Sequence, residues 1–389
     1  MKFTEQIKQW LTPHQPLPSG IFTYHTPPDA PTPYRLHLRI EKDGSGVLVV
    51  NAATVLHLNQ TAAEFAYHFI SQTADQEVAK LVSQRYHIST QQALQDYQQF
   101  RDRIQELILT PDLDPITFLE FERSTPYTHA ISAPYRLDCA LTYRYSENDD
   151  SAASAHQNVD RELTCEEWKK IIDKAWQAGI PHLIFTGGEP TLRSDLADLL
   201  AYAEQYGLVT GIITNGLRLT DRDFFEHLAC QGLDHLMLVL DPDNHHCWDA
   251  LKIILPDDMF TAVHLTITPK NQLRVPQILQ QLAEMGANAI SLSVSDPSLQ
   301  PLLEQARQQT AHLHLSLVWD LPVPYSNLNP LALELPSEES IQGAGKAWLY
   351  VEPDGDVLPA QGMQPYLGNI LDDEWQTIWS NAQTKLGSI

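Results

Sequence analysis

The chain has 389 residues, of which 43% are hydrophobic and 19% charged, a composition typical of a globular protein with two or three domains. Its net charge of −24 argues against binding to a nucleic-acid backbone, which requires clustered lysine and arginine. No apolar run reaches the roughly 18–20 residues of a membrane span, and the polar N-terminal residues are unlike a signal peptide. We therefore expect a cytoplasmic protein with neither a membrane nor a nucleic acid as partner.

Residues 1–33 contain several prolines, and we expect an extended arm that lies on the surface. Residues 34–110 form the next predicted domain. Its β-rich segments 34–41, 47–50 and 54–58 are followed by three helical patterns, of which the first is expected to start at a capping box formed by Thr61 and Glu64. Short strands followed by three helices predict a winged-helix-like module.

Residues 49–62, from Val49 to Ala62, resemble PqqD-type domains, which recognise leader peptides in the maturation of ribosomally made peptides. The resemblance covers roughly residues 34–108. It implies a domain that binds a precursor or leader peptide by adding it as a strand to the edge of its sheet.

Residues 111–135 are a predicted linker, and residues 136–320 alternate between strand and helix patterns. A capping box at Thr164 and Glu167 and a closing Gly179 delimit the first helix. Repeated βα units predict a parallel sheet or partial barrel. The expected strands are residues 137–143, 182–186, 208–213, 234–240, 261–267, 288–294 and 312–318.

Three of these strands carry polar residues on one face, which predicts either a polar lumen or strands exposed at an open edge. The polar residues are His264, Thr266, Thr268, Ser291, Ser293, Ser295, His312, His314 and Ser316. The three histidines could meet in the lumen, but they lie away from the carboxyl-terminal rim where barrel sites form. His245 and His246, followed by Cys247, are expected to be solvated at a helix start. We therefore predict no metal ligands.

Two segments resemble the radical S-adenosylmethionine (radical SAM) family: Leu141–Ala152, which matches its cluster loop, and Phe185–Arg193, which contains its Gly-Gly-Glu-Pro motif. The resemblance implies an α/β fold with a partial (β/α)6 barrel. The family's loop has three cysteines that hold an iron–sulfur cluster. Here the corresponding residues are Tyr145, Asp149 and Ala152.

Residues 321–389 resemble the SPASM/twitch extension of peptide-modifying radical SAM proteins, through the predicted hairpin of residues 343–360. In that family, cysteines for an auxiliary cluster stand where this chain has Gln342 and Ala360. Its four cysteines, Cys139, Cys165, Cys230 and Cys247, have no metal-binding spacing. The sequence therefore predicts no cofactor, although the family uses a [4Fe–4S] cluster and S-adenosylmethionine.

No catalytic residue is predicted, and two sets of binding residues are. The turns after two strands are candidates for a residual S-adenosylmethionine site, or alternatively are kept for the shape of the turns: Gly187, Gly188, Glu189, Pro190, Thr214 and Asn215. The rim of the barrel supplies a candidate ligand-lining set: Asp241, Thr268, Asp296 and Asp320.

Together these features favour a pseudoenzyme that binds a precursor or leader peptide and acts as a scaffold or as the partner of an active radical SAM maturase. The alternative is a cluster-independent enzyme or small-ligand-binding protein that uses the polar lumen. An active radical SAM maturase is the least favoured interpretation, because thiolates are the ligands that the cluster requires.

Overall fold

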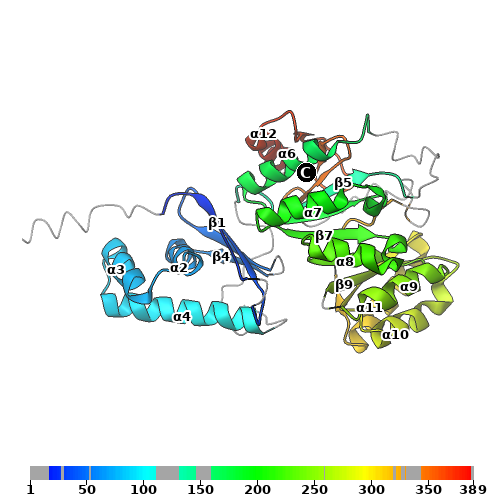
Figure 1. Ribbon diagram of the computed structural model, residues 1–389, viewed down its shortest axis with the longest axis horizontal. Coiled ribbons are helices and arrows are strands. Elements are labelled where there is room, and N and C mark those ends of the chain that lie inside the picture. Colours follow the sequence, from blue (N-terminus) through cyan, green and yellow to red (C-terminus); the bar gives the residue numbers. More distant parts are fainter. Residues whose placement is uncertain are drawn as a thin grey trace, which may run out of the picture. The chain divides into compact units, whose positions relative to one another are not determined.

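The computed structural model describes residues 17–27, 30–51, 54–110, 131–145, 159–257, 259–318, 321–325, 329 and 343–386. The chain divides into two compact units, Met1–Ile131 and Ser132–Ile389 (Figure 1). No helix in these described ranges is long and apolar enough to cross a membrane. Residues 111–130 of the predicted linker 111–135 lie outside the described residues, as do Asp149, Ala152, Asp320 and Gln342.

The first unit is a four-stranded antiparallel sheet in the order β1-β2-β3-β4, followed by three helices (Figure 1). Alternate residues of a strand lie on the same face of a sheet. In this sheet one face is apolar and packs on the helices, and Leu38, Leu48 and Leu56 lie side by side on it. The elements are β1 (Gly20–His25), β2 (Arg35–Ile40), β3 (Gly46–Val50), β4 (Thr54–Leu58), α2 (Gln60–Ile70), α3 (Asp75–Tyr86) and α4 (Thr90–Leu109).

The start of α2 differs from the prediction. Asn59 is the N-cap and its side chain accepts a hydrogen bond from the Ala62 backbone N–H. Glu64 is fully buried and its carboxylate lies 3.0 Å from Arg85 Nε. The capping box at Thr61 and Glu64 was therefore wrong, because a buried carboxylate gains more from an ion pair than from the helix end.

Strand β1 comes from the segment that we expected to be an arm on the surface. Gly20–His25 pairs with β2 in antiparallel register, from Gly20 opposite Ile40 to His25 opposite Arg35. Ile21, Phe22 and Tyr24 have high β-propensity, and this was the signal available in the sequence. Residues 1–16 of the arm lie outside the described residues.

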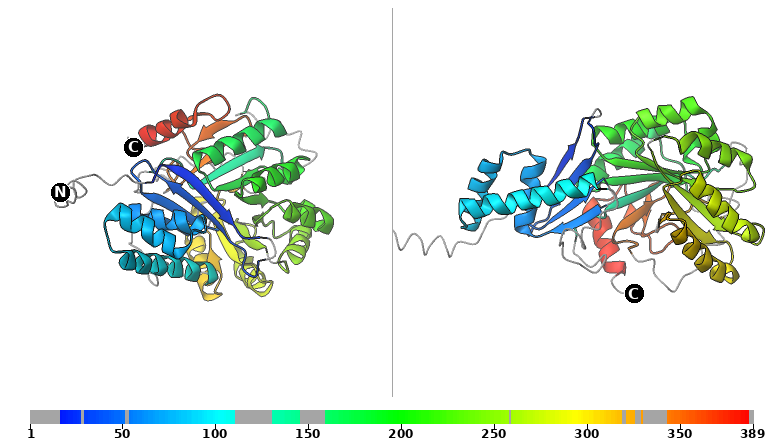
Figure 2. Two further views of the ribbon diagram at one scale, coloured as in Figure 1. Left: turned by 60° about the vertical axis from the view of Figure 1, so that its left-hand side comes forward. Right: turned by 90° about the horizontal axis from the view of Figure 1, so that it is seen from below.

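The second unit contains a ten-stranded sheet in the order β11-β10-β9-β8-β7-β6-β5-β12-β13-β14. Strands β5 to β11 are parallel to their neighbours, and the helices lie along the outer side of this curved sheet (Figure 2). The strands are β5 (Arg136–Thr142), β6 (His182–Gly187), β7 (Val209–Thr214), β8 (His235–Val239), β9 (Phe260–Ile267), β10 (Ala289–Val294), β11 (Ser316–Leu317), β12 (Trp348–Val351), β13 (Asp356–Leu358) and β14 (Gly368–Asn369).

The helices of this unit follow the strands in turn. The first begins at the expected capping box of Thr164 and Glu167 and ends at Gly179, which has a φ of 81°. They are α6 (Cys165–Ala178), α7 (Leu196–Gln205), α8 (Arg222–Cys230), α9 (His245–Ile254), α10 (Val275–Glu284), α11 (Gln300–His312) and α12 (Trp375–Leu386), with short 3-10 turns η2 (Pro190–Leu192), η3 (Leu217–Thr220), η4 (Gln272–Arg274) and η5 (Pro297–Leu299).

The C-terminal extension joins the same sheet. Strand β12 pairs in parallel with β5, and β12 and β13 form the expected antiparallel hairpin. Tyr143, just after β5, is buried and donates a hydrogen bond of 2.9 Å to Glu352. Burial raises the pKa of this tyrosine well above its ordinary value, so the hydroxyl stays protonated and keeps donating.

The predicted strand at residues 312–318 is largely wrong. Helix α11 continues to His312, and His314 has a left-handed φ of 57°, so only Ser316–Leu317 is extended as β11. Leu303, Ala306 and Thr310 follow the helical period and are buried, which outweighs the polar–apolar alternation of the next residues.

Candidate functional site at the carboxyl ends of the parallel strands

The turn after β6 is packed directly against the end of β5. The Gly188 N–H donates to Thr142 O and the Glu189 N–H donates to Arg144 O, each at 2.7 Å. A Cβ atom on Gly187 would lie 2.1 Å from Thr142 O, and one on Gly188 would lie 2.3 Å from Arg144 O. The glycines are therefore required by the approach of β5, which favours the structural interpretation of this motif.

Glu189 joins the turns after β6 and β7. Its buried carboxylate accepts hydrogen bonds from the Thr191 N–H at 3.0 Å, the Thr214 hydroxyl at 2.8 Å and the Asn215 N–H at 2.7 Å. Burial raises its pKa, and these hydrogen bonds oppose that rise. The structure thus brings Glu189, Thr214 and Asn215 together as a brace, with Pro190 starting the short turn η2 behind them.

Thr186, directly before the two glycines, was not among the predicted residues. It is fully buried, and its hydroxyl has no hydrogen-bond partner among the residues that the structure describes. A buried hydroxyl without a partner costs about 1–3 kcal/mol, so such a group is typical of a position that meets a ligand. The sequence offered only its place before the motif as a signal, because burial and partners depend on neighbouring strands.

The predicted ligand-lining residues follow three adjacent strands but serve local turns. Asp241 Oδ1 accepts from the Asp243 N–H at 3.0 Å, and Thr268 exchanges two hydrogen bonds with Asn271. Asp296 is exposed, and hydrogen bonds from the Ser298 hydroxyl and the Ser298 N–H lower its pKa. These side chains share the rim of the sheet, and each one stabilises the turn that follows its strand.

His264 is the centre of a polar cluster on β9 and β10. Its Nδ1 lies 2.9 Å from Ser291 Oγ, and its Nε2 lies 3.0 Å from Ser293 Oγ. Thr266 Oγ1 lies 3.1 Å from the same Nε2. Complete burial lowers the pKa of His264 to about 4, so the imidazole is neutral near pH 7. A neutral imidazole among hydroxyls can hold or pass a proton.

The same face of the sheet is apolar elsewhere. Parallel register places His264 beside Val239 and Ser291. The residues two positions earlier on these three strands lie on the same face, and they are apolar. They belong to an apolar cluster that consists of Ile184, Ile213, Met237, Val239, Ala262 and Ala289. His312 and His314 are exposed beyond this sheet face, and the three-histidine lumen cluster therefore does not form.

The cysteines do not fit a three-thiolate cluster. Cys139 is buried in β5, Cys165 begins α6, Cys230 ends α8, and Cys247 lies on α9 with its Sγ 3.5 Å from Asn215 O. Burial raises the thiol pKa of Cys139, Cys165 and Cys247, whereas metal binding requires the thiolate. Of the predicted degenerate cluster positions, Tyr145 follows Arg144 at the rim and Ala360 is buried after β13.

Residues 142–264 match the family model of the Radical SAM superfamily. This stretch of the chain is similar to the radical SAM domain. The chain is also similar in sequence to two curated proteins named PqqA peptide cyclase. The first, from Bradyrhizobium diazoefficiens, is 26% identical over 311 residues, which cover 68% of this chain and 77% of that protein. The second, from Streptomyces rochei, is 27% identical over 263 residues, which cover 59% and 70%.

Solved structures of SuiB from Streptococcus suis have the same fold. The structure of SuiB bound to its precursor peptide SuiA has a TM-score of 0.55 at 16% identity, and the match covers 88% of this chain and 86% of SuiB. SuiB bound to S-adenosylmethionine gives a TM-score of 0.54 with the same coverage. These comparisons confirm an α/β radical SAM-like fold with a mainly parallel sheet.

The prediction that the chain has no cofactor was wrong. It rested on the missing cysteines alone. The match to the Radical SAM family model and the S-adenosylmethionine-bound structure of the similar protein SuiB contradict it. The cysteine positions bear on which residues could hold a cluster.

Proposed function

We propose that this chain takes part in the modification of a ribosomally made peptide, where it binds the precursor peptide and S-adenosylmethionine and acts as the scaffold or partner of an active maturase. The observation that carries this proposal is the contrast at the rim. The brace formed by Glu189, Thr214 and Asn215 is complete, while the four thiols are dispersed and two of them are buried. The names of the PqqA peptide cyclases and the SuiA-bound form of SuiB support a peptide as partner.

The first unit offers a sheet edge for the peptide. Strand order places β1 and β4 at the two edges. Pro18 and Pro27 lie on either side of β1, and prolines beside an edge strand limit the addition of another strand. Strand β4, with Leu56 and Leu58 fixed in the core, is the edge that we assign to the peptide.

Strand addition predicts an alternating effect of backbone methylation. In a synthetic precursor peptide encoded beside this gene, N-methylation at every second residue should weaken binding about tenfold or more, because each methyl removes a main-chain donor and adds a clash. Methylation at the intervening residues should leave the affinity unchanged. Fluorescence anisotropy with the full-length chain measures both series.

A photo-crosslinking amino acid at Val55 should capture this peptide, and one at Thr23 on β1 serves as the matched control that should not. Equal effects of both methylation series would contradict strand addition, and capture from Thr23 alone would move the site to the other edge. Absence of any binding would contradict the peptide-binding role itself.

S-adenosylmethionine would occupy the rim beside Thr186 and the Gly187-Gly188 turn, where it would supply an activated sulfonium. The fit rests on the Thr186 hydroxyl, which is buried and without a partner among the described residues. The brace around Glu189 fixes the backbone of that turn. The chain's own contribution is thus to position the ligand and to exclude water.

The change Thr186→Val should weaken S-adenosylmethionine binding about tenfold and, without ligand, stabilise the chain by about 1 kcal/mol, because it removes an unsatisfied hydroxyl at nearly constant shape. Equilibrium dialysis with labelled ligand and chemical denaturation measure the two effects. Thr214→Val is the matched control. It should destabilise the chain by roughly 2 kcal/mol, because its hydroxyl serves both Glu189 and the Gly216 N–H. A destabilised Thr186→Val variant with unchanged ligand affinity would remove Thr186 from the site.

A further inference from the structure

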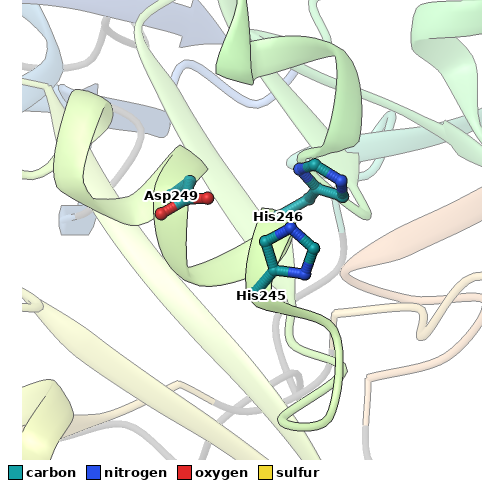
Figure 3. Close-up of side chains that lie close together, drawn as sticks. All are labelled: His245, His246 and Asp249. Atoms are coloured by element: carbon teal, nitrogen blue, oxygen red, sulfur yellow. The ribbon is translucent and has the colours of Figure 1, made fainter.

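The first turn of α9 carries three potential metal ligands at the rim of the sheet. His245, His246 and Asp249 each offer one ligand atom, and these atoms all lie within 4.8 Å of one another (Figure 3). The helix follows β8, so the group stands where the parallel strands end. It also lies near the proposed cofactor turn, because Cys247 Sγ is 3.5 Å from Asn215 O.

Local structure holds the two imidazoles close together. Asn244 caps the helix and its side chain accepts from the His246 N–H at 3.1 Å. The two ring centroids are 3.9 Å apart. Asp249 lies three and four residues further on, a spacing that places side chains on one face of a helix. The sequence therefore brings two histidines and one carboxylate to a single helical turn.

The donor atoms are available. His245 and His246 are exposed, and no hydrogen bond to their ring nitrogens occurs among the residues that the structure describes. Asp249 Oδ1 accepts from Lys252 Nζ at 2.9 Å, which leaves Oδ2 for a ligand.

We propose that His245 Nδ1 or Nε2, the corresponding nitrogen of His246 and Asp249 Oδ2 bind one divalent transition-metal ion, of the class that includes Zn²⁺, Co²⁺ and Ni²⁺. Imidazole and carboxylate together select such ions. Ligand atoms about 2.1 Å from a tetrahedral ion lie roughly 3.4 Å apart, so rotation of the exposed side chains closes the site. Three ligands leave at least one position open at the rim.

The partial positive charge of the helix N-terminus disfavours a cation at this site, and the Asp249 carboxylate offsets that effect. The second group of clustered ligands, Glu352, Asp354 and Asp356, differs because its carboxylates already accept hydrogen bonds from Tyr143, Asp160 and Asn369.

Titration of the untagged full-length chain with Zn²⁺, against a chelating indicator, tests this site. One Zn²⁺ ion should bind. His245→Ala, His246→Ala and Asp249→Asn should each weaken Zn²⁺ binding at least about tenfold, because even residues that only support metal ligands contribute that much. With Co²⁺, visible absorption of a histidine-ligated ion should appear in the wild type and disappear in the same variants.

His227→Ala removes an exposed helical histidine, and Glu352→Gln alters the second cluster, so both should leave the affinity unchanged. The absence of saturable binding would overturn the proposal, as would unchanged Zn²⁺ affinity in the double variant His245→Ala/His246→Ala. Because the three side chains are at the surface, these variants should keep the far-ultraviolet circular dichroism of the wild type. Failure of this site would leave peptide and S-adenosylmethionine binding untouched, since those use other residues.

Discussion

Replacing Gly187 by alanine should destabilise the second unit by about 4 kcal/mol or more, because a clash in a packed interior adds to backbone strain. The new Cβ would lie 2.1 Å from Thr142 O, and the residue has a φ of +120°. Backbone atoms of β5 cannot move aside as a flexible side chain would. The turn that carries Glu189 should therefore lose its contact with β5.

Chemical denaturation followed by tryptophan fluorescence measures this effect, because every tryptophan except Trp10 lies in the second unit. Gly286→Ala is the matched control. Gly286 has a φ of +85°, yet a Cβ there would meet nothing within 4 Å, so only the left-handed conformation costs energy, about 1 kcal/mol. Equal losses of stability in the two variants would show that residue 187 is a glycine because of its backbone conformation and not because of the approach of β5.

Acidification should destabilise the second unit through His264. The pKa of this histidine is about 4 in the folded chain and 6.5 in the unfolded chain. Between these values the unfolded chain binds more protons, so stability is lost as the pH falls through this window. The loss should reach roughly 3 kcal/mol between pH 7 and pH 4, since one pKa unit corresponds to about 1.4 kcal/mol.

Other groups titrate in the same range, so the effect is isolated with His264→Gln. The difference in unfolding free energy between wild type and variant should shrink by that amount across the window. His312→Gln, at the exposed end of α11, should leave the pH dependence as it is. If the unfolding free energy depended on pH in the same way in the wild type and in His264→Gln, protonation of His264 in the folded chain would cost no stability.

Local patterns were sufficient to predict most of the elements. The βα alternation, the capping box at Thr164 and Glu167 and the closing Gly179 each act within a few residues, and the structure follows them. The two errors in strands depend on remote partners. Strand β1 exists because β2 is available to pair with it, whereas in the predicted strand around His314 the residues before Ser316 have no strand partner among the described residues.

The candidate site could be predicted only in outline. The turns containing Glu189 and Asn215 follow adjacent strands, so their proximity follows from the order of a parallel sheet. The role of Gly187 and the unsatisfied hydroxyl of Thr186 depend on distances to β5 that no local pattern encodes. The cofactor prediction failed for a different reason, because it judged the cofactor from the missing cysteines alone.

The pairing of β12 with β5 has a consequence for the order of folding. Arg136 lies opposite Trp348 and Cys139 lies opposite Val351, although nearly the whole barrel separates them in sequence. During synthesis the β5 edge is therefore exposed until residues 348–351 have left the ribosome, and contacts between such distant segments form slowly. A chain whose synthesis stops before residue 348 would expose the unpaired, hydrophobic edge of β5. We therefore expect such nascent fragments to aggregate easily and to bind chaperones.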